Sequence, residues 1–405
     1  MLIFACDKQG NATQDSMKRL LIFHPAPAPY RVDFFNEIGR RFCVHIVFLR
    51  REAEEVLVAQ QKLLEGATFT YEYIPYHFRV LGRDIGFGYT KILRRFRPDT
   101  VIATEFSMSL LVPLLLRSFA GFKYKVLTQC DDSIFMAEAR TGGRRRRANW
   151  MLRRADGMIT ISREVSEWYL RNTPVKRAIE FPIIHDETAF SEHRSEIQQM
   201  AASHIRRFSL AGHRVGLFVG RFVEVKNLPL LLRVLAQVNP RLPSDWRFVL
   251  VGDGDEAPLL HQQVATSELS DHVIFVGRHE GLSLWAWYAV ASFIVLPSRQ
   301  EAFGAVVGEA LQMGCRALVS KYAGGRSLIR ERETTDDEEK DLRGLGNGKV
   351  FSPDETDEFQ RTILEEYLFA EPTPAEGFGR NSIMPFGFDG AMCRLEAEIK
   401  EIINR

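Results

Sequence analysis

The block from Pro297 to Gly314 holds the residues best suited to binding and chemistry. A short apolar strand ends just before it, and a helix is expected to begin near Gly304. The backbone N–H groups of Phe303, Gly304 and Ala305 would then be unpaired. Together with the positive end of the helix dipole, such groups favour a bound diphosphate. Because Gly304 lacks a side chain, a ligand can approach the backbone closely.

Two carboxylates accompany this helix start. Glu301 lies just before the helix, and Glu309 lies about two turns further along. This spacing lets the two side chains contact different parts of one extended ligand. The structural alternative makes Glu301 a charge that complements the helix dipole and leaves Glu309 in solvent.

A pair of cations follows the strand expected at 214–219. Gly220 and Arg221 end this strand, and Lys226 stands shortly before the next helix. Two cations at the carboxyl end of a strand can clamp a pyrophosphate. Read alone, the same segment also fits an ordinary charged surface loop.

Polar residues also follow strands of the amino-terminal half. His24 and Tyr30 bound the stiff loop HPAPAPY after the first strand, Glu105 follows another strand, and Asp131 and Asp132 follow a third. Either aspartate could serve a second substrate as a base or as a hydroxyl ligand. The alternative is that an aspartate, or the serine after the pair, caps the next helix.

The elements that must position these residues alternate between short apolar strands and longer helices. This alternation predicts parallel sheets covered by helices on both faces, and two such series predict an α/β protein with two Rossmann-like, doubly wound domains. Ligands bind such sheets at the carboxyl ends of the strands, so two facing sheets would enclose a cleft. The expected strands are 19–23, 43–48, 100–103, 124–128, 157–161 and 178–181, then 214–219, 246–251, 272–276, 293–296 and 316–319.

The chain is expected to divide at the polar, helix-prone stretch between the two series. The predicted organisation is a disordered extension at 1–16 (or a chain start at Met17), a first domain at 17–190, a linker at 191–205, a second domain at 206–384, and a final helix at 387–405 that packs back on the first domain.

Composition agrees with a globular protein of this size. The chain has 405 residues, 45% hydrophobic and 26% charged, which argues against a disordered chain, a collagen and a disulfide-knit module. Five widely spaced cysteines without C-x-x-C spacing indicate neither a zinc site nor a disulfide framework, so a reducing cytoplasmic setting is expected. The uncharged run from Gly281 to Ser298 is predicted to be a helix followed by a buried strand rather than a membrane span.

The net charge of +1 conceals an uneven distribution. Residues 1–200 carry 30 Lys and Arg against 23 Asp and Glu, whereas residues 201–405 carry 23 against 29. Much of the positive excess lies in Arg140–Arg154, which contains seven arginines with Trp150 interleaved. The simplest interpretation is a solvated surface. The functional alternative is a patch that meets an anionic membrane, and nucleic acid is not expected as a partner.

Taken together, the motifs of the second half resemble the carboxy-terminal domain of GT-B glycosyltransferases, and best match family 4, which are retaining enzymes with nucleotide-sugar donors. The resemblance is strong over about 210–330. It rests on the order and spacing of Gly220-Arg221, Lys226-Asn227, Gly252-Asp253-Gly254, Val276-Gly277, and the E-x7-E motif from Glu301 to Glu309. The amino-terminal half matches only in pattern.

The resemblance implies a role for each matching residue. Arg221 and Lys226 would hold the donor diphosphate, Glu301 would contact the donor sugar, and Glu309 would bind the nucleotide ribose. The implied catalytic residues are thus Glu301, Arg221 and Lys226, and the implied donor-binding residues are Glu309, Phe303, Gly304, Ala305, Gly220, Val276 and Arg278. The resemblance implies neither a cofactor nor a bound metal, because the cations and the helix dipole supply the positive charge.

The implied reaction moves a sugar from a UDP- or GDP-sugar to a hydroxyl acceptor with retained anomeric configuration, in polysaccharide, lipopolysaccharide or glycolipid biosynthesis. The acceptor-side candidates are Asp131, Asp132, His24, Tyr30 and Glu105. The expected location is cytoplasmic, with peripheral attachment to the inner face of the cytoplasmic membrane through Arg140–Arg154. Two alternatives remain, a GT-B nucleotide-sugar epimerase and a non-catalytic nucleotide-sugar-binding protein.

Overall fold

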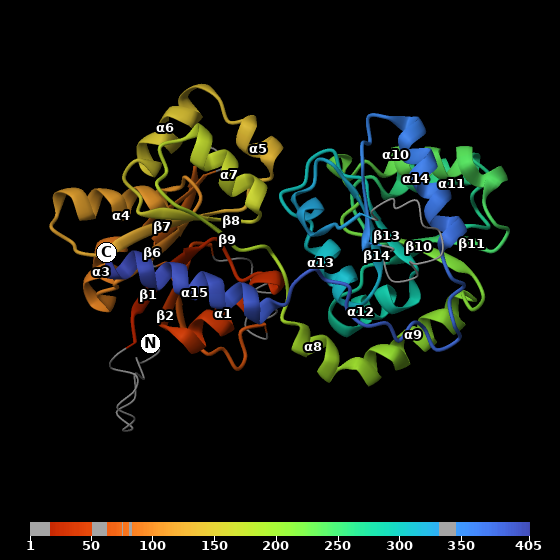
Figure 1. Ribbon diagram of the computed structural model, residues 1–405, viewed down its shortest axis with the longest axis horizontal. Helices are drawn as coiled ribbons and strands as arrows, with labels where there is room; N and C mark the ends of the chain where they lie inside the picture. The colour runs from red at the N-terminus through yellow and green to blue at the C-terminus, as the bar shows by residue number, and fades with distance from the viewer. Residues whose placement is uncertain (1–16, 51–62, 75, 81–82, 332–345) are drawn as a thin grey trace, which may run out of the picture.

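The computed structural model describes residues 17–50, 63–74, 76–80, 83–331 and 346–405. Two α/β halves lie side by side, and each is built around its own sheet (Figure 1). The disordered extension predicted at 1–16 lies outside the described residues. No helix among the described residues is long and apolar enough to cross a membrane.

The first half contains a seven-stranded sheet in the order β3-β2-β1-β6-β7-β8-β9. Every neighbouring pair of strands in it is parallel. Its strands are β1 (Arg19–His24), β2 (Cys43–Phe48), β3 (Thr70–Tyr73), β6 (Thr100–Thr104), β7 (Lys125–Cys130), β8 (Gly157–Thr160) and β9 (Ala178–Glu180). Its helices are α1 (Pro29–Arg41), α3 (Tyr89–Phe96), α4 (Met108–Phe119), α5 (Ile134–Glu138), α6 (Gly142–Leu152) and α7 (Arg163–Asn172), and β4 (Tyr76–Val80) and β5 (Arg83–Phe87) form a separate antiparallel hairpin.

The second half contains a six-stranded, fully parallel sheet in the order β12-β11-β10-β13-β14-β15. Its strands are β10 (Arg214–Val219), β11 (Trp246–Val251), β12 (Val273–Gly277), β13 (Phe293–Leu296), β14 (Arg316–Ser320) and β15 (Gly348–Phe351). Its helices are α10 (Leu228–Val238), α11 (Ala257–Thr266), α12 (Gly281–Val290), α13 (Ala305–Gln312) and α14 (Thr356–Phe369), with short 3-10 turns η1 (Glu224–Lys226), η2 (Asn239–Arg241) and η3 (Gly324–Leu328).

The prediction of two doubly wound parallel sheets is confirmed. Strands such as β1 and β10 are buried over five successive residues, as expected where helices cover both faces of a sheet. The sequence analysis missed β3, β15 and the β4–β5 hairpin. β3 and β15 are four-residue strands at the outer edges of the sheets, so they lack the continuous apolar run that marked the central strands.

Helices also connect the two halves. The stretch expected as a linker at 191–205 is largely helical and belongs to α8 (Glu187–Glu192) and α9 (Arg194–Phe208), of which α9 packs on α12. The final helix α15 (Phe388–Asn404) returns from the second half and packs on α1 and β9 of the first (Figure 1).

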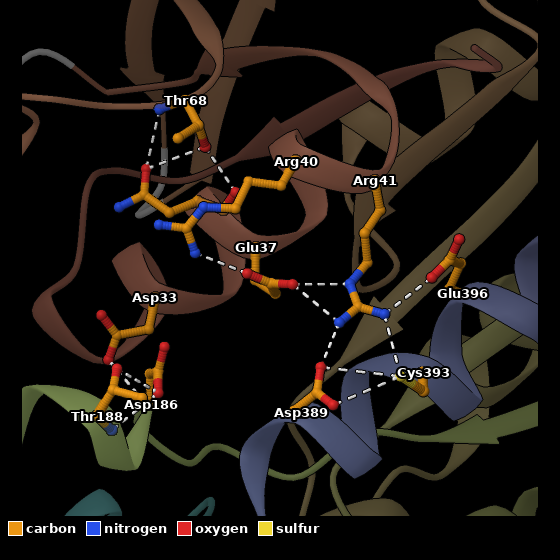
Figure 2. A network of polar contacts seen from close by, with 11 residues as sticks. Asp33, Glu37, Arg40, Arg41, Thr68, Asp186, Thr188, Asp389, Cys393 and Glu396 are labelled. Atoms are coloured by element: carbon orange, nitrogen blue, oxygen red, sulfur yellow. Dashed lines mark hydrogen bonds and ion pairs between the residues drawn. The ribbon is translucent and has the colours of Figure 1, made fainter.

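One arginine anchors this returning helix. Arg41, at the end of α1, donates hydrogen bonds to Glu37 on its own helix and to Asp389 and Glu396 on α15, with N···O distances of 2.5 to 2.8 Å (Figure 2). Near the chain end, Arg177 pairs with Glu401 at 2.9 Å. Charged pairs therefore fix both ends of α15 on the first half.

The loops at the carboxyl ends of β10 and β11 are in direct backbone contact. Gly252 has φ of 140°, and a Cβ placed there would lie 1.9 Å from the carbonyl oxygen of Gly220. The N–H of Phe222 also donates to the carbonyl oxygen of Asp253 at 2.8 Å. The Gly-Asp-Gly turn therefore supports the loop that carries Arg221.

Replacing Gly252 by Ala should destabilise the second half by more than about 3 kcal/mol, because the new methyl group would collide with fixed backbone. Gly277→Ala is the matched control. Gly277 also has positive φ, 77°, but a Cβ there would meet nothing within 4 Å, so the loss should be about 1 kcal/mol. Urea unfolding of both variants measures the difference, and equal losses would contradict the contact.

Candidate functional site

The turn after β13 has the geometry expected for the start of a binding helix. Gly304 caps α13 in the left-handed region, with φ of 87°, and a Cβ there would lie 2.6 Å from the Leu296 side chain. Within the described residues, no hydrogen bond is donated by the N–H groups of Phe303, Gly304 or Ala305. Three backbone donors and a helix dipole therefore meet at this turn.

Lys226 and Glu301, which are distant in sequence, form an ion pair beside this turn. Both side chains are largely buried. Two further bonds join their loops: the Asn227 amide donates to the Pro297 carbonyl at 3.3 Å, and the Arg299 N–H donates to the Val225 carbonyl at 2.8 Å. The structure thus brings together two of the three predicted catalytic residues.

The remaining donor-side residues are more exposed. Arg221 follows β10 at the surface, and its guanidinium has no ion-pair partner within the described part of the chain. Arg278 is also exposed and pairs with Glu280, while Val276 is half-buried in β12. Among the described residues, no carboxylate therefore pairs with Arg221, whereas Glu280 pairs with Arg278.

Glu309 lies on α13 and is engaged through both carboxylate oxygens. The hydroxyl of the buried Tyr288 donates to Oε2 at 2.6 Å, and His185 Nε2 lies 3.2 Å from Oε1. The other ring nitrogen, Nδ1, lies 2.8 Å from Asp33 Oδ2 on α1 of the first half. Asp33 also accepts a hydrogen bond from the N–H of Asp186 at the start of α8 (Figure 2).

His185 is held as a cation by these neighbours. Burial alone would lower the pKa of its imidazole, but the hydrogen bonds to Asp33 and Glu309 and their negative charges outweigh burial and raise the pKa to about 9. Sequence reasoning did not single out His185, Asp33 or Tyr288. The only available signal was the pair His185-Asp186 directly after a buried apolar run.

On the first half, the predicted acceptor side centres on a buried arginine. Arg31 is 1% exposed and binds Asp131 at 2.5 Å. Gln129, oriented with its amide oxygen toward the guanidinium, accepts from it at 2.8 and 2.9 Å. His24 is buried and its Nδ1–H donates to the Ala26 carbonyl at 2.9 Å; burial and the charge of Arg31 lower its pKa to about 4, so the ring is neutral. Tyr30 is at the surface nearby, 36% exposed.

The two adjacent aspartates have different environments. Asp131 is partly exposed, whereas Asp132 is 2% exposed and receives hydrogen bonds from Arg140 at 2.7 Å and from the Tyr169 hydroxyl at 2.6 Å. Neither aspartate caps α5, and the Ser133 side chain makes no capping bond either. Arg140 is therefore an internal partner of Asp132 rather than part of the exposed arginine segment.

Glu105 has a left-handed backbone conformation. It lies just after β6 with φ of 48°, which is unusual for a residue with a side chain. Part of the residue is exposed, yet surrounding protein desolvates its carboxyl, and this burial, with the negative charges of Asp132 and Asp131, raises its pKa to about 7. Glu105 is thus a carboxyl that can exchange a proton near neutral pH.

The carboxyl edges of the two sheets are in contact. Phe135 of α5 packs edge-to-face on Tyr322, which follows β14, at a centroid separation of 4.7 Å. Arg326 in η3 donates to Glu164 in α7 at 2.5 Å. The donor-side and acceptor-side residues therefore belong to facing edges. Among the described residues, no three His, Cys, Asp or Glu side chains are grouped to hold a metal ion.

Residues 205–365 match the sequence model of the family described as "Glycosyl transferases group 1". Similar curated proteins include a lipopolysaccharide core biosynthesis mannosyltransferase of Rhizobium leguminosarum, 25% identical over 63% of this chain and 66% of the relative. An N-acetylgalactosaminyltransferase of Campylobacter jejuni, named for an undecaprenol-linked acceptor, is 33% identical over 28% of this chain and 31% of the relative. Both matches span less than two thirds of the relative's length.

Solved structures extend the likeness to nearly the whole chain. The Anabaena protein HepE, crystallised with UDP, aligns over 96% of this chain and 100% of its own with a TM-score of 0.69 at 18% identity. A lipopolysaccharide outer core galactosyltransferase, WaaB, aligns over 87% of this chain and 91% of its own with a TM-score of 0.59 at 16% identity. Residues 205–365 are therefore similar to the glycosyl transferases group 1 family, and the chain has the two-sheet GT-B fold.

Proposed function

We propose that this protein is a retaining glycosyltransferase of family 4 that moves a sugar from a nucleotide diphosphate sugar to a hydroxyl acceptor. The observation that carries the proposal is the arrangement at the start of α13. There, Lys226 and Glu301 meet beside three unpaired backbone N–H groups, and Arg221 stands at the same edge of the sheet. The cations and the N–H groups complement the negative charge of a diphosphate, and Glu301 can accept hydrogen bonds from the attached sugar.

The names of the similar proteins support the same class of substrates. HepE was crystallised with UDP and with UDP-glucose. One bacterial relative is named for lipopolysaccharide core biosynthesis, and the other for an undecaprenol-linked saccharide. We therefore propose a UDP- or GDP-sugar as donor and a carbohydrate or lipid-linked acceptor. The proposed setting is cytoplasmic synthesis of a polysaccharide, lipopolysaccharide or glycolipid.

The charges of the site suggest how it assists the reaction. The bond between the anomeric carbon and the diphosphate oxygen breaks, and the acceptor oxygen forms the new bond on the same face of the sugar. Negative charge grows on the leaving diphosphate, where Arg221, Lys226 and the start of α13 would stabilise it. An arriving diphosphate competes with Glu301 for Lys226, which would release the Glu301 carboxylate toward the sugar hydroxyls.

The acceptor would approach from the first half. Asp131 and Glu105 carry the accessible carboxyl groups there, and Tyr30 adds a surface hydroxyl. Because the pKa of Glu105 is about 7, it can bind the acceptor hydroxyl as a carboxylate and accept its proton. His24 and Asp132 are buried, so we propose that they support this surface rather than touch the acceptor.

Replacing Lys226 by Ala should lower the rate of sugar transfer at least about 100-fold, because a cation that stabilises the leaving diphosphate is lost. Glu309→Ala should chiefly weaken donor binding. Lys349→Ala is the matched control, since Lys349 lies in the edge strand β15 of the same half and pairs with Glu365 of α14. Release of nucleotide from UDP- and GDP-sugars with saccharide acceptors gives the rate, and NMR of the product gives its anomeric configuration.

Full activity in a folded Lys226→Ala variant would contradict the donor-site assignment. Conversion of the donor to its epimer without an acceptor would favour the epimerase alternative, and donor binding without release of nucleotide under any acceptor would favour a binding protein.

Glu105→Gly should stabilise the folded protein by about 1 kcal/mol, because glycine adopts positive φ without strain. The same change should reduce transfer by removing the acceptor-side carboxyl. Arg97→Gly provides the control: Arg97 has φ of 51° at the end of α3, so its replacement should raise stability without changing transfer. Thermal unfolding and transfer rates measure both effects, and full activity in Glu105→Gly would remove Glu105 from the acceptor site.

We also propose that the first half binds the surface of an anionic membrane through α6. Arginines are exposed on this helix and just after it: Arg144, Arg146, Arg147, Arg153 and Arg154. Two aromatic side chains are exposed nearby, Trp150 on α6 and Phe119 on α4, and these two helices pack together. Cations with exposed aromatic side chains suit the charged interface of a bilayer.

Sedimentation with vesicles that contain phosphatidylglycerol should carry the protein down, and vesicles of phosphatidylcholine alone should not. Arg146→Ala with Arg147→Ala should weaken this binding about tenfold or more, at roughly 1 kcal/mol per arginine. The control is Arg206→Ala with Arg207→Ala, an equally charged pair on α9 of the other half. Equal effects of the two double variants, or binding indifferent to lipid charge, would exclude this surface.

A further inference from the structure

A single imidazole joins a carboxylate of each half of the protein. His185 lies on the segment that crosses between the halves, is 7% exposed, and has one carboxylate oxygen within 3.2 Å of each ring nitrogen. One oxygen belongs to Asp33 on α1 and the other to Glu309 on α13. The crossing segment is also fixed to α13, because the Gln312 amide donates to the His185 carbonyl at 2.6 Å.

The chemistry of these groups requires a charged ring. A carboxylate only accepts hydrogen bonds, so both ring nitrogens must donate, and only the imidazolium has two N–H groups. The titratable groups around it are Asp33 from α1, Glu309 from α13, Tyr288 from α12 through its bond to Glu309, and the adjacent Asp186. None of these neighbours is cationic.

We propose that His185 is a positioning residue for the donor nucleotide: its imidazolium holds Glu309 in the orientation that receives the ribose and ties that carboxylate to Asp33 on the acceptor side. This inference rests on the proposed function of Glu309. Each carboxylate oxygen can accept more than one hydrogen bond. Tyr288 and His185 therefore fix the plane of the carboxylate and still leave acceptor sites for two ribose hydroxyls.

The bridge also connects the two substrate sites. Asp33 lies two residues after Arg31, whose guanidinium holds Asp131 on the acceptor side. Helix α1 therefore carries both the acceptor-side ion pair and the partner of His185. A shift of α1 when an acceptor binds would be transmitted to Glu309 through one ring, which couples the two binding events.

A purely structural role of His185 would have different consequences. If His185 only linked the two halves, its loss would change the stability of the fold, whereas a positioning residue makes nucleotide binding depend on its protonation. When His185 loses a proton, one of its nitrogens becomes an acceptor facing a carboxylate, and the bridge opens. Since the pKa of His185 is about 9, nucleotide binding should be strong at neutral pH and weaken as pH rises through about 9.

The experiment compares the wild type with His185→Gln, Asp33→Asn and the control His193→Gln, an exposed histidine at the start of α9. Calorimetry with UDP and with GDP between pH 6.5 and 10 gives binding constants for the full chain. NMR of histidine ring nitrogens gives the pKa of His185 without any ligand. Asp33→Asn removes one charge and retains the shape of the side chain, so it tests the bridge even where His185→Gln folds poorly.

We expect His185→Gln to bind the nucleotide about tenfold more weakly at pH 7, because a charge-assisted hydrogen bond to Glu309 is lost. Asp33→Asn should move the alkaline fall in binding to lower pH by roughly one unit, since an anion that favours the imidazolium is gone. His193→Gln should match the wild type at every pH.

Equal binding by His185→Gln and the wild type, or an Asp33→Asn pH profile that coincides with that of the wild type, would overturn the inference and leave the proposed function intact. A His185 pKa near the ordinary value of 6.5 would also overturn it. A wild type that binds neither nucleotide at any pH would instead refute the proposed function, and the donor role of His185 with it.

Discussion

Parallel strands end at the same edge of their sheet, and this constraint places most of the candidate site residues of the protein. Lys226 and Glu301 follow β10 and β13, and Glu105 and Asp131 follow β6 and β7. The contacts of Phe135 with Tyr322 and of Arg326 with Glu164 bring the two carboxyl edges against each other. Groups that would serve a donor and an acceptor thus face one another, because ligands bind parallel sheets at the carboxyl ends of their strands.

Buried charged groups at these edges are paired with groups of opposite charge. Arg31 is almost fully buried and is held by Asp131; Lys226 is held by Glu301; His185 stands between Asp33 and Glu309. Buried charges without partners would be strongly destabilising. These pairs compensate the buried charges before a ligand arrives, and Arg221 has no ion-pair partner among the described residues. An anionic ligand would then exchange partners with groups that are already oriented.

Sequence reasoning recovered the central elements and the donor-side loops well. The run FIVL was expected as the strand 293–296 and is β13, and the helix expected near Gly304 is α13, which begins at Ala305. Edge strands were harder to predict. TYEY in β3 and GKVF in β15 are only partly buried, and neither sequence is a continuous apolar run. The adjacent aspartates show the same limit at a site. Asp131 and Asp132 are chemically identical, and only packing against Tyr169 and Arg140 decides that Asp132 is internal.

The sequence by itself determined the alternation of strands and helices, the α/β class, and the chemistry available at the helix start after β13. These features are local, since burial on both faces, helix capping and the need for glycine at Gly304 act over a few residues. Only the tertiary structure decided that Glu309 meets a histidine 124 residues earlier, and that the same ring reaches Asp33 a further 152 residues back along the chain. No periodicity encodes such contacts, because they form where the edges of two different sheets meet and the buried charges there need partners.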